Sequence, residues 1–243
     1  AQEGGGEVSH HELPTVLPPA AEPAGGAEPN AVQALPEVKS SRLIGTLAGF
    51  GGLAGLILVL AFQWTDPLIK KNQAEALQGA VAEVLKNPVR TQRFFVIDGR
   101  LATEAPAGAD TLALDRVFLG YDAQDAPTGF AMTHSEAGFQ DQVLVIFAYD
   151  PRTGSLFGMK VLENKETPGL GDKIVKDSAF VSAFEGALAP LIGVKAGAGT
   201  GDDHEIDMIT GATISSRAVI NIINHRIEQV DPVLKAYLEG EQS

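Results

Sequence analysis

The 243-residue chain contains no cysteine. This absence excludes disulfide bonds, iron–sulfur ligation, thiol catalysis and attachment of a c-type haem by this chain. A redox function would therefore need an organic cofactor or a metal held by nitrogen and oxygen ligands. No two of the five histidines stand four residues apart, the spacing that places two metal ligands on one helix face. We predict no metal site and no catalytic side chain.

Basic residues are also scarce. The chain has 18 Lys and Arg against 31 Asp and Glu, a net charge of −13, and the basic residues form no run. A nucleic-acid surface needs clustered Lys and Arg to neutralise phosphates. The composition therefore excludes nucleic acid as a partner.

Residues 1–42 are rich in Pro, Ala, Gly and Glu and have no hydrophobic period. A segment of this kind cannot bury enough apolar area to offset the entropy of ordering it. We predict that it is disordered. A segment that becomes ordered on a partner subunit stays open as an alternative.

The run from Leu43 to Phe62 has no charged residue. Twenty helical residues at about 1.5 Å each span roughly 30 Å, the thickness of a bilayer's hydrocarbon core. Trp64, the only tryptophan, follows at a position typical of a membrane interface. We predict a transmembrane helix over residues 43–65, although the flanking positive charges are too evenly divided to fix its orientation.

Residues 66–243 combine helical and strand patterns. They predict an α+β domain in which a curved antiparallel sheet is packed by helices. The predicted helices are Asp66–Lys86, Ser178–Leu188 and Ile214–Glu239, and the predicted strands are Arg93–Ile97, Arg116–Tyr121, Gly129–Thr133, Gln142–Tyr149 and Phe157–Glu163.

The segment from Asp207 to Arg217 joins a polar loop to the last predicted helix. Its small residues leave room beside the backbone, and the helix start directs free N–H groups and a positive dipole end at that space. Such a place suits a phosphate, with Arg217 one turn away from Thr213. A plain helix cap that binds nothing is the open alternative. The four hydroxyl-bearing residues of the segment are Thr210, Thr213, Ser215 and Ser216.

Two motifs resemble those of the FMN-binding domain family, which includes the G subunit of the Rnf ion-translocating oxidoreductase complex and the C subunit of the sodium-translocating NADH:quinone oxidoreductase. Thr210-Gly211-Ala212-Thr213 followed by Ile-Ser-Ser is similar to its S/T-G-A-T-x-S/T signature. Glu166–Ile174, with the sequence ETPGLGDKI, is similar to its E-T-P-G-L-G loop. Gly138-Phe139-Gln140 resembles its entry to a strand. Asn164 departs from the family, which often has histidine there.

The resemblance implies FMN bound covalently through its phosphate to Thr213. The cofactor-binding residues it implies are Thr210, Gly211, Ala212, Ile214, Ser215, Ser216 and Arg217 in the first motif and Glu166, Thr167, Gly169 and Leu170 in the second. We hypothesise that Glu166 meets polar atoms of the flavin. For Asp207, help in holding Mg²⁺ during flavin transfer and a loop-capping role both stay open.

The residue sequences of both motifs resemble the Rnf G subunit more closely than the C subunit of the quinone oxidoreductase. The resemblance therefore implies an electron-relay subunit of a membrane-bound oxidoreductase, in the bacterial inner membrane, with residues 66–243 facing the periplasm. Its implied partners are other membrane subunits, a flavin transferase during maturation, and membrane lipid. Three alternatives remain open: a single-pass redox sensor, a stand-alone flavin reductase, and a structural subunit without flavin.

Overall fold

The computed structural model describes residues 40–109 and 114–241. Residues 1–39, which make up nearly all of the predicted disordered segment, lie outside the described residues. The chain divides into two compact units, residues 1–59 and residues 60–243.

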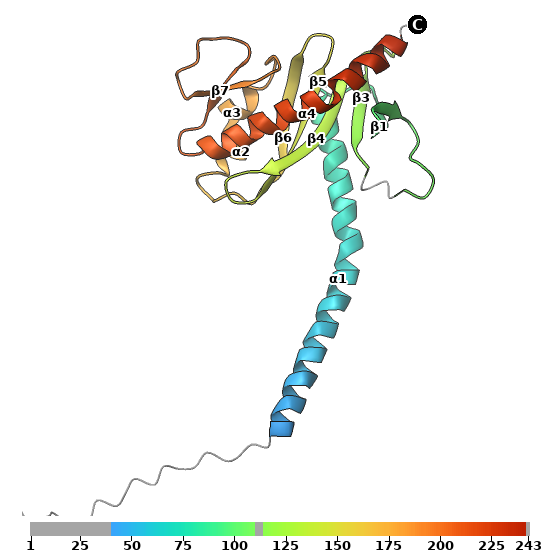
Figure 1. Cartoon of the computed structure of the whole chain (residues 1–243), viewed down its shortest axis with the longest axis vertical. Coiled ribbons are helices and arrows are strands. Elements are labelled where there is room, and N and C mark those ends of the chain that lie inside the picture. Colours follow the sequence, from blue (N-terminus) through green and yellow to red (C-terminus); the bar gives the residue numbers. More distant parts are fainter. Residues whose placement is uncertain (1–39, 110–113, 242–243) are drawn as a thin grey trace, which may run out of the picture. The chain divides into compact units, whose positions relative to one another are not determined.

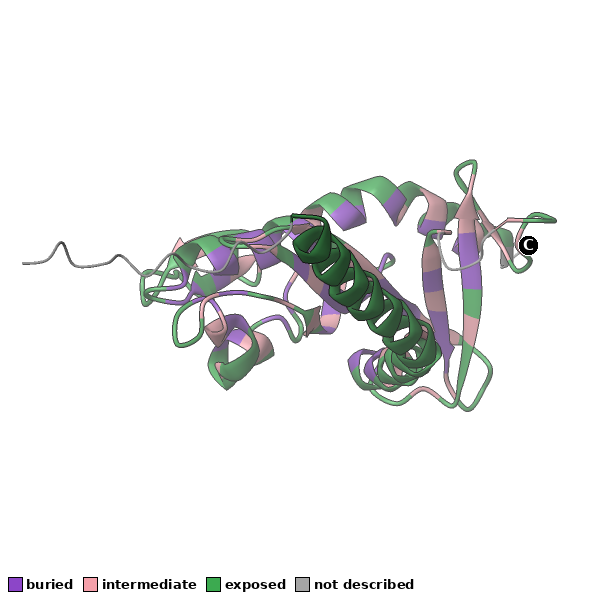
Figure 2. Cartoon of the chain, turned by 90° about the horizontal axis from the view of Figure 1, so that it is seen from below, coloured by how far each residue is buried: buried purple, intermediate pink, exposed green. Residues whose placement is uncertain are grey.

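Helix α1, Ser40–Val84, is continuous and contains both the predicted membrane helix and the helix predicted to follow it. Its large apolar side chains from Leu43 to Phe62 are at least half exposed, and its buried residues begin only at Ala80. Figure 2 shows this exposure along the helix. Within the described residues it is the one helix long and apolar enough to cross a membrane. Exposed apolar side chains in such a run fit a lipid environment.

Six antiparallel strands form the main sheet, in the order β2-β1-β3-β4-β5-β6 (Figure 1). Register shifts in the β3–β4 and β5–β6 pairs mark bulges, which bend and twist a sheet. The predicted α+β fold with a curved antiparallel sheet is thereby confirmed. The strands are β1 Arg90–Ile97, β2 Arg100–Ala102, β3 Arg116–Tyr121, β4 Pro127–Ala137, β5 Gln142–Asp150 and β6 Ser155–Glu163.

The two faces of the sheet are covered by different helices. Helix α4, Thr213–Glu241, packs residues such as Val219, Ile223 and Leu234 on the face that carries Phe130 and Phe147. On the opposite face, the end of α1 packs Ala80, Val81, Val84 and Leu85 against strand residues Ala131, Ile146 and Ala148. Because successive strand residues point to opposite faces, the alternating pattern of the strands creates both cores.

The helix predicted over Ser178–Leu188 is wrong in its length. Helix α3 spans only Ser178–Ser182, after the short helix α2, Lys173–Lys176. Gly186 has a φ of +85°, which no α-helix contains. Its N–H donates to the carbonyl of Leu156, and the Leu156 N–H donates to the carbonyl of Ala187. The segment therefore leaves the helix to pair with the start of β6.

A small parallel pair was not predicted from the sequence. Strand β7, Ile192–Lys195, pairs with β8, Glu205–Met208. Strand β8 leads directly into the turn before α4. Helix α4 begins one residue before and ends two residues after the helix predicted over Ile214–Glu239.

Candidate functional site

The turn between β8 and α4 is formed by residues 209–212. Gly211 has a φ of +83°, a conformation that glycine adopts without strain. The Ala212 N–H donates to the carbonyl of Ile209 at 3.0 Å. The first helical bond of α4 runs from Ser216 N–H to the carbonyl of Ala212, at 2.8 Å. The N–H groups of Thr213, Ile214 and Ser215, at the start of the helix, therefore have no carbonyl acceptor within the helix.

Two of the four hydroxyls in this segment bind protein groups. Ser216 is fully buried, and its Oγ accepts from the N–H of Ile209 at 3.1 Å and donates to the carbonyl of Ala212 at 2.9 Å. Ser215 is also buried, and its Oγ donates to Glu166 Oε2 at 2.7 Å. Both serines therefore fix the turn and the first turn of α4.

Glu166 joins three segments that are distant in sequence. Its side chain is buried, and Oε1 accepts from the N–H groups of Phe139 and Gln140 at 2.9 and 3.2 Å. Oε2 accepts from Ser215. The sequence hypothesis placed this carboxylate against a flavin. In the structure its oxygens bind the loop after β4 and the start of α4. These contacts suit a positioning residue, and the predicted flavin contact stays a prediction.

Gly171 permits this arrangement. A Cβ at this position would lie 2.5 Å from Glu166 Oε2 and 2.9 Å from Ser215 Oγ. Both distances are shorter than a van der Waals contact. A side chain at residue 171 would therefore displace the carboxylate or the hydroxyl.

Beside these contacts lies an apolar cavity of about 290 Å³ at the N-terminus of α4. Thr213 is exposed there. Phe139, Leu170 and Ile214 are 63%, 52% and 56% exposed, so apolar side chains line the same cavity as Thr213. The cavity is lined by Phe139, Thr167, Leu170, Gly171, Gly211, Ala212, Thr213, Ile214 and Ser215.

The structure brings seven of the predicted cofactor residues to this cavity: Thr167, Leu170, Gly211, Ala212, Thr213, Ile214 and Ser215. The other five, Glu166, Gly169, Thr210, Ser216 and Arg217, do not line it. Two lining residues, Phe139 and Gly171, were not among the predicted contacts. The resemblance of Gly138-Phe139-Gln140 to a family motif was the signal for Phe139.

Thr210 lies on the other side of the turn, in a cavity of about 630 Å³ that Lys173, Lys176 and Asp207 also line. Arg217 is exposed and has no ion pair within the described part of the chain. The Nζ atom of Lys173 comes within 3.9 Å of the place that a Cβ on Gly211 would occupy. The Thr210 cavity has charged side chains in its lining, whereas the Thr213 cavity has none.

Asp172 organises the loop that carries Leu170. Its Oδ1 accepts from the N–H of Gly169 at 2.7 Å, and its Oδ2 pairs with Lys176. The contact with Lys176 and the Gly169 N–H lower the pKa of Asp172 below its ordinary value. Gly169 therefore stabilises the turn of this loop through its N–H bond to Asp172.

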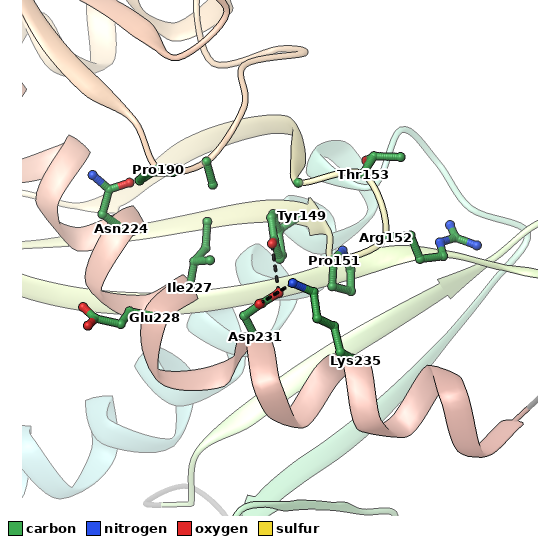
Figure 3. A pocket seen from close by; sticks show the side chains of 12 residues that line it. Tyr149, Pro151, Arg152, Thr153, Pro190, Asn224, Ile227, Glu228, Asp231 and Lys235 are labelled. Carbon is green, nitrogen blue, oxygen red and sulfur yellow. Dashed lines mark hydrogen bonds and ion pairs between the residues drawn. The ribbon is translucent and has the colours of Figure 1, made fainter.

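Another cavity, of about 520 Å³, lies between the β5–β6 hairpin and the middle of α4 (Figure 3). The Tyr149 hydroxyl donates to Asp231 Oδ1 at 2.9 Å, and Lys235 Nζ lies 2.7 Å from Asp231 Oδ2. Burial and Asp231 raise the pKa of Tyr149 above its ordinary value. No residue of either motif lines this cavity, whereas seven of the predicted cofactor residues line the Thr213 cavity. The Thr213 cavity is therefore the candidate site.

The FMN-binding domain family model matches residues 138–228, a span that contains every lining residue of the Thr213 cavity. The G subunit of the ion-translocating oxidoreductase complex of Shewanella loihica is 29% identical over 194 residues, covering 78% of this chain and 87% of that protein. Its counterpart from Cereibacter sphaeroides is 32% identical over 208 residues, covering 80% and 90%. The chain belongs to this family of G subunits.

The family predicted from the two motifs is thereby confirmed. The crystal structure of Shewanella oneidensis NqrC is similar to this fold with a TM-score of 0.58 at 20% identity, covering 69% of this chain and 99% of that one. The likeness to NqrC shows a shared fold. Within that fold, the family match covers the loop after β4, the Glu166 loop and the N-terminal half of α4.

Proposed function

We propose that this chain is the electron-transfer flavoprotein subunit of a membrane-bound ion-translocating oxidoreductase complex, and that it carries FMN as a phosphoester on Thr213. Membership of the G-subunit family supports the first part. The match to the FMN-binding domain supports the cofactor. The geometry around the turn supports the attachment residue.

One observation carries the choice of Thr213. Of the four hydroxyls in the segment, those of Ser215 and Ser216 are buried in hydrogen bonds, and Thr210 lies in the separate cavity that Lys173, Lys176 and Asp207 also line. Thr210 and Thr213 are both exposed, and of these two only Thr213 lines the apolar cavity. Its hydroxyl is therefore the one that an enzyme can reach beside an apolar surface.

The residues present fit such a group. The N–H groups of Thr213, Ile214 and Ser215 precede the first bonded N–H of α4, and helix N-termini favour phosphate. Phe139 and Leu170 supply exposed apolar surface for an aromatic ring system. FMN, when bound, takes up and releases electrons. The chain holds its phosphate and ring, and Glu166 fixes the relative position of the two loops.

The membrane arrangement belongs to the same proposal. Residues 43–65 span the membrane, with 1–42 on the cytoplasmic side and the flavin domain, 66–243, on the periplasmic side. The exposed apolar surface of α1 supports the span. Other membrane subunits of the complex exchange electrons with the chain, and a flavin transferase attaches the cofactor.

In-gel flavin fluorescence after denaturation tests the proposal. The full chain is expressed with an active flavin transferase as wild type, as Thr213→Ala and as the control Thr210→Ala. Wild type and Thr210→Ala should fluoresce, whereas Thr213→Ala should not, because only Thr213 forms the ester. A dark wild-type band would contradict covalent attachment, and a fluorescent Thr213→Ala band would place it on another residue.

A further inference from the structure

Lys173 is a cation close to the turn that presents Thr213. It is the first residue of α2, and its side chain is partly buried. Within residues 40–109 and 114–241 its ammonium group has no carboxylate at ion-pair distance, whereas Lys176, three residues later, pairs with Asp172. One lysine of this loop is therefore bound to a protein carboxylate, and the other is available to a different anion.

Gly211 marks the place where Lys173 meets the Thr213 cavity. The point that a Cβ on Gly211 would occupy lies 3.9 Å from Lys173 Nζ and also 3.9 Å from Leu170 Cδ2. Leu170 and Gly211 line the Thr213 cavity, whereas Lys173 lines the Thr210 cavity. The ammonium group of Lys173 therefore lies at the boundary between the two cavities, and all of these residues belong to the unit of residues 60–243.

A phosphate on Thr213 is within reach of this ammonium group. Thr213 follows Gly211 by two residues, and Cα atoms two residues apart are separated by at most about 7.6 Å. Lysine carries its charge on a flexible stem of four carbons. A phosphate on the Thr213 hydroxyl extends beyond the threonine side chain, so Lys173 can contact it without any movement of the backbone.

The charges at this position favour an anion between Lys173 and α4. The N-terminus of α4 carries a partial positive charge, because its first N–H groups have no acceptor within the helix. A lysine beside such a helix end is unfavourable by itself, since helix N-termini favour negative charge. A phosphate there can accept hydrogen bonds from the free N–H groups and a charge-assisted bond from the lysine.

We propose that Lys173 binds the phosphate of the flavin attached to Thr213. The proposal rests on the proposed function and adds to it a residue that was not among the predicted cofactor contacts. The sequence suggested Arg217 as the cation near the phosphate, but Arg217 is exposed and lines neither cavity. FMN joined to Thr213 through its phosphate is a diester with a single negative charge, which one lysine balances.

Thermal unfolding of the full chain in detergent, with and without the flavin, tests the proposal. Wild type, Lys173→Gln and Lys173→Arg are each expressed without and with an active flavin transferase, and far-UV circular dichroism gives the melting temperature. Without flavin, Lys173→Gln should melt about 1–3 °C above wild type, because it removes a cation from a helix N-terminus. With flavin, it should melt about 3–6 °C below wild type, because the phosphate loses its partner. Lys173→Arg keeps the charge and should melt close to wild type in both states.

The reversal of sign distinguishes phosphate binding from a purely structural role. A difference between Lys173→Gln and wild type that keeps the same sign in both states would overturn the proposal. The matched control, Lys195→Gln, removes an exposed lysine charge on β7 and should leave both melting temperatures unchanged. If Arg217→Gln shows the reversal and Lys173→Gln does not, the phosphate is bound by Arg217 and the proposal is wrong.

In-gel fluorescence of the same samples separates this inference from the proposed function. A dark wild-type band would refute the covalent flavin and the role of Lys173 together, whereas a fluorescent wild type without the reversal would refute only the role of Lys173. Loss of flavin loading in Lys173→Gln that Lys173→Arg restores would support the same contact. Loss of loading in both variants would contradict it, because arginine keeps the charge.

Discussion

Replacing Glu166 with glutamine removes the charge of the carboxylate that joins the two motif loops and keeps its shape. The wild-type side chain accepts three hydrogen bonds, from Phe139 N–H, Gln140 N–H and Ser215 Oγ. Hydrogen bonds to a charged group contribute about 1.5–3 kcal/mol each and neutral ones about 1 kcal/mol. Relief of the buried charge offsets part of that difference. We therefore expect Glu166→Gln to lower the free energy of unfolding by about 2 kcal/mol.

Urea unfolding, followed by far-UV circular dichroism, measures this change. Glu166→Ala should cost at least about 3 kcal/mol, because it leaves three donors without an acceptor, at about 1 kcal/mol or more each. Glu163→Gln is the control, since Glu163 is exposed and contacts Gln73 only at 3.4 Å, and it should stay within about 0.5 kcal/mol of wild type. If Glu166→Gln unfolds at the same urea concentration as Glu163→Gln, the carboxylate does not hold the loops together.

Two further predictions concern the cavity lined by Tyr149 and Asp231 and the orientation of the chain in the membrane. The pKa of Tyr149 is raised in the folded protein, so the folded state retains this proton after the unfolded chain begins to lose it near pH 10. The stability from this group is complete below that pH and falls by about 1.4 kcal/mol per pH unit above it. Tyr149→Phe, which loses the bond to Asp231, should be about 1 kcal/mol less stable at neutral pH, and the gap should narrow in urea titrations above about pH 10; a constant gap would contradict the raised pKa. Because the chain lacks cysteine, single cysteines can report orientation: a membrane-impermeant maleimide should label Gln124→Cys in cells with a permeabilised outer membrane but label Glu28→Cys only after lysis, and the reverse pattern would invert the proposed topology.

Most of the main fold could be predicted because it depends on local pattern. The strand Arg116–Tyr121 was predicted with its observed bounds, since alternation of buried and less buried residues is visible in sequence. Helix α4 was predicted within two residues at each end for the same reason. The β7–β8 pair was missed because each strand has only four residues, too few for a period to be visible.

The sequence predicted which segments contribute to the candidate site but not the bonds within it. The motifs predicted one site from the Thr213 turn and the Glu166 loop, and in the structure Thr167 and Leu170 line one cavity with Thr213. The role of Glu166 depends on contacts with residues 27 and 49 positions away, and nothing in a single sequence reports such pairing. The same limit hid Gly171, whose importance is the space it leaves beside Ser215 Oγ.

These internal bonds bear on the order in which the site is made. Glu166 binds the backbone of the loop after β4 and the Ser215 hydroxyl, and Ser216 binds both ends of the turn, all through protein groups. None of these bonds requires a cofactor. On the proposed function, we therefore expect the turn that presents Thr213 to form before the flavin is attached. The flavin transferase then meets the exposed Thr213 hydroxyl at the start of α4, while the neighbouring serines are withheld by burial.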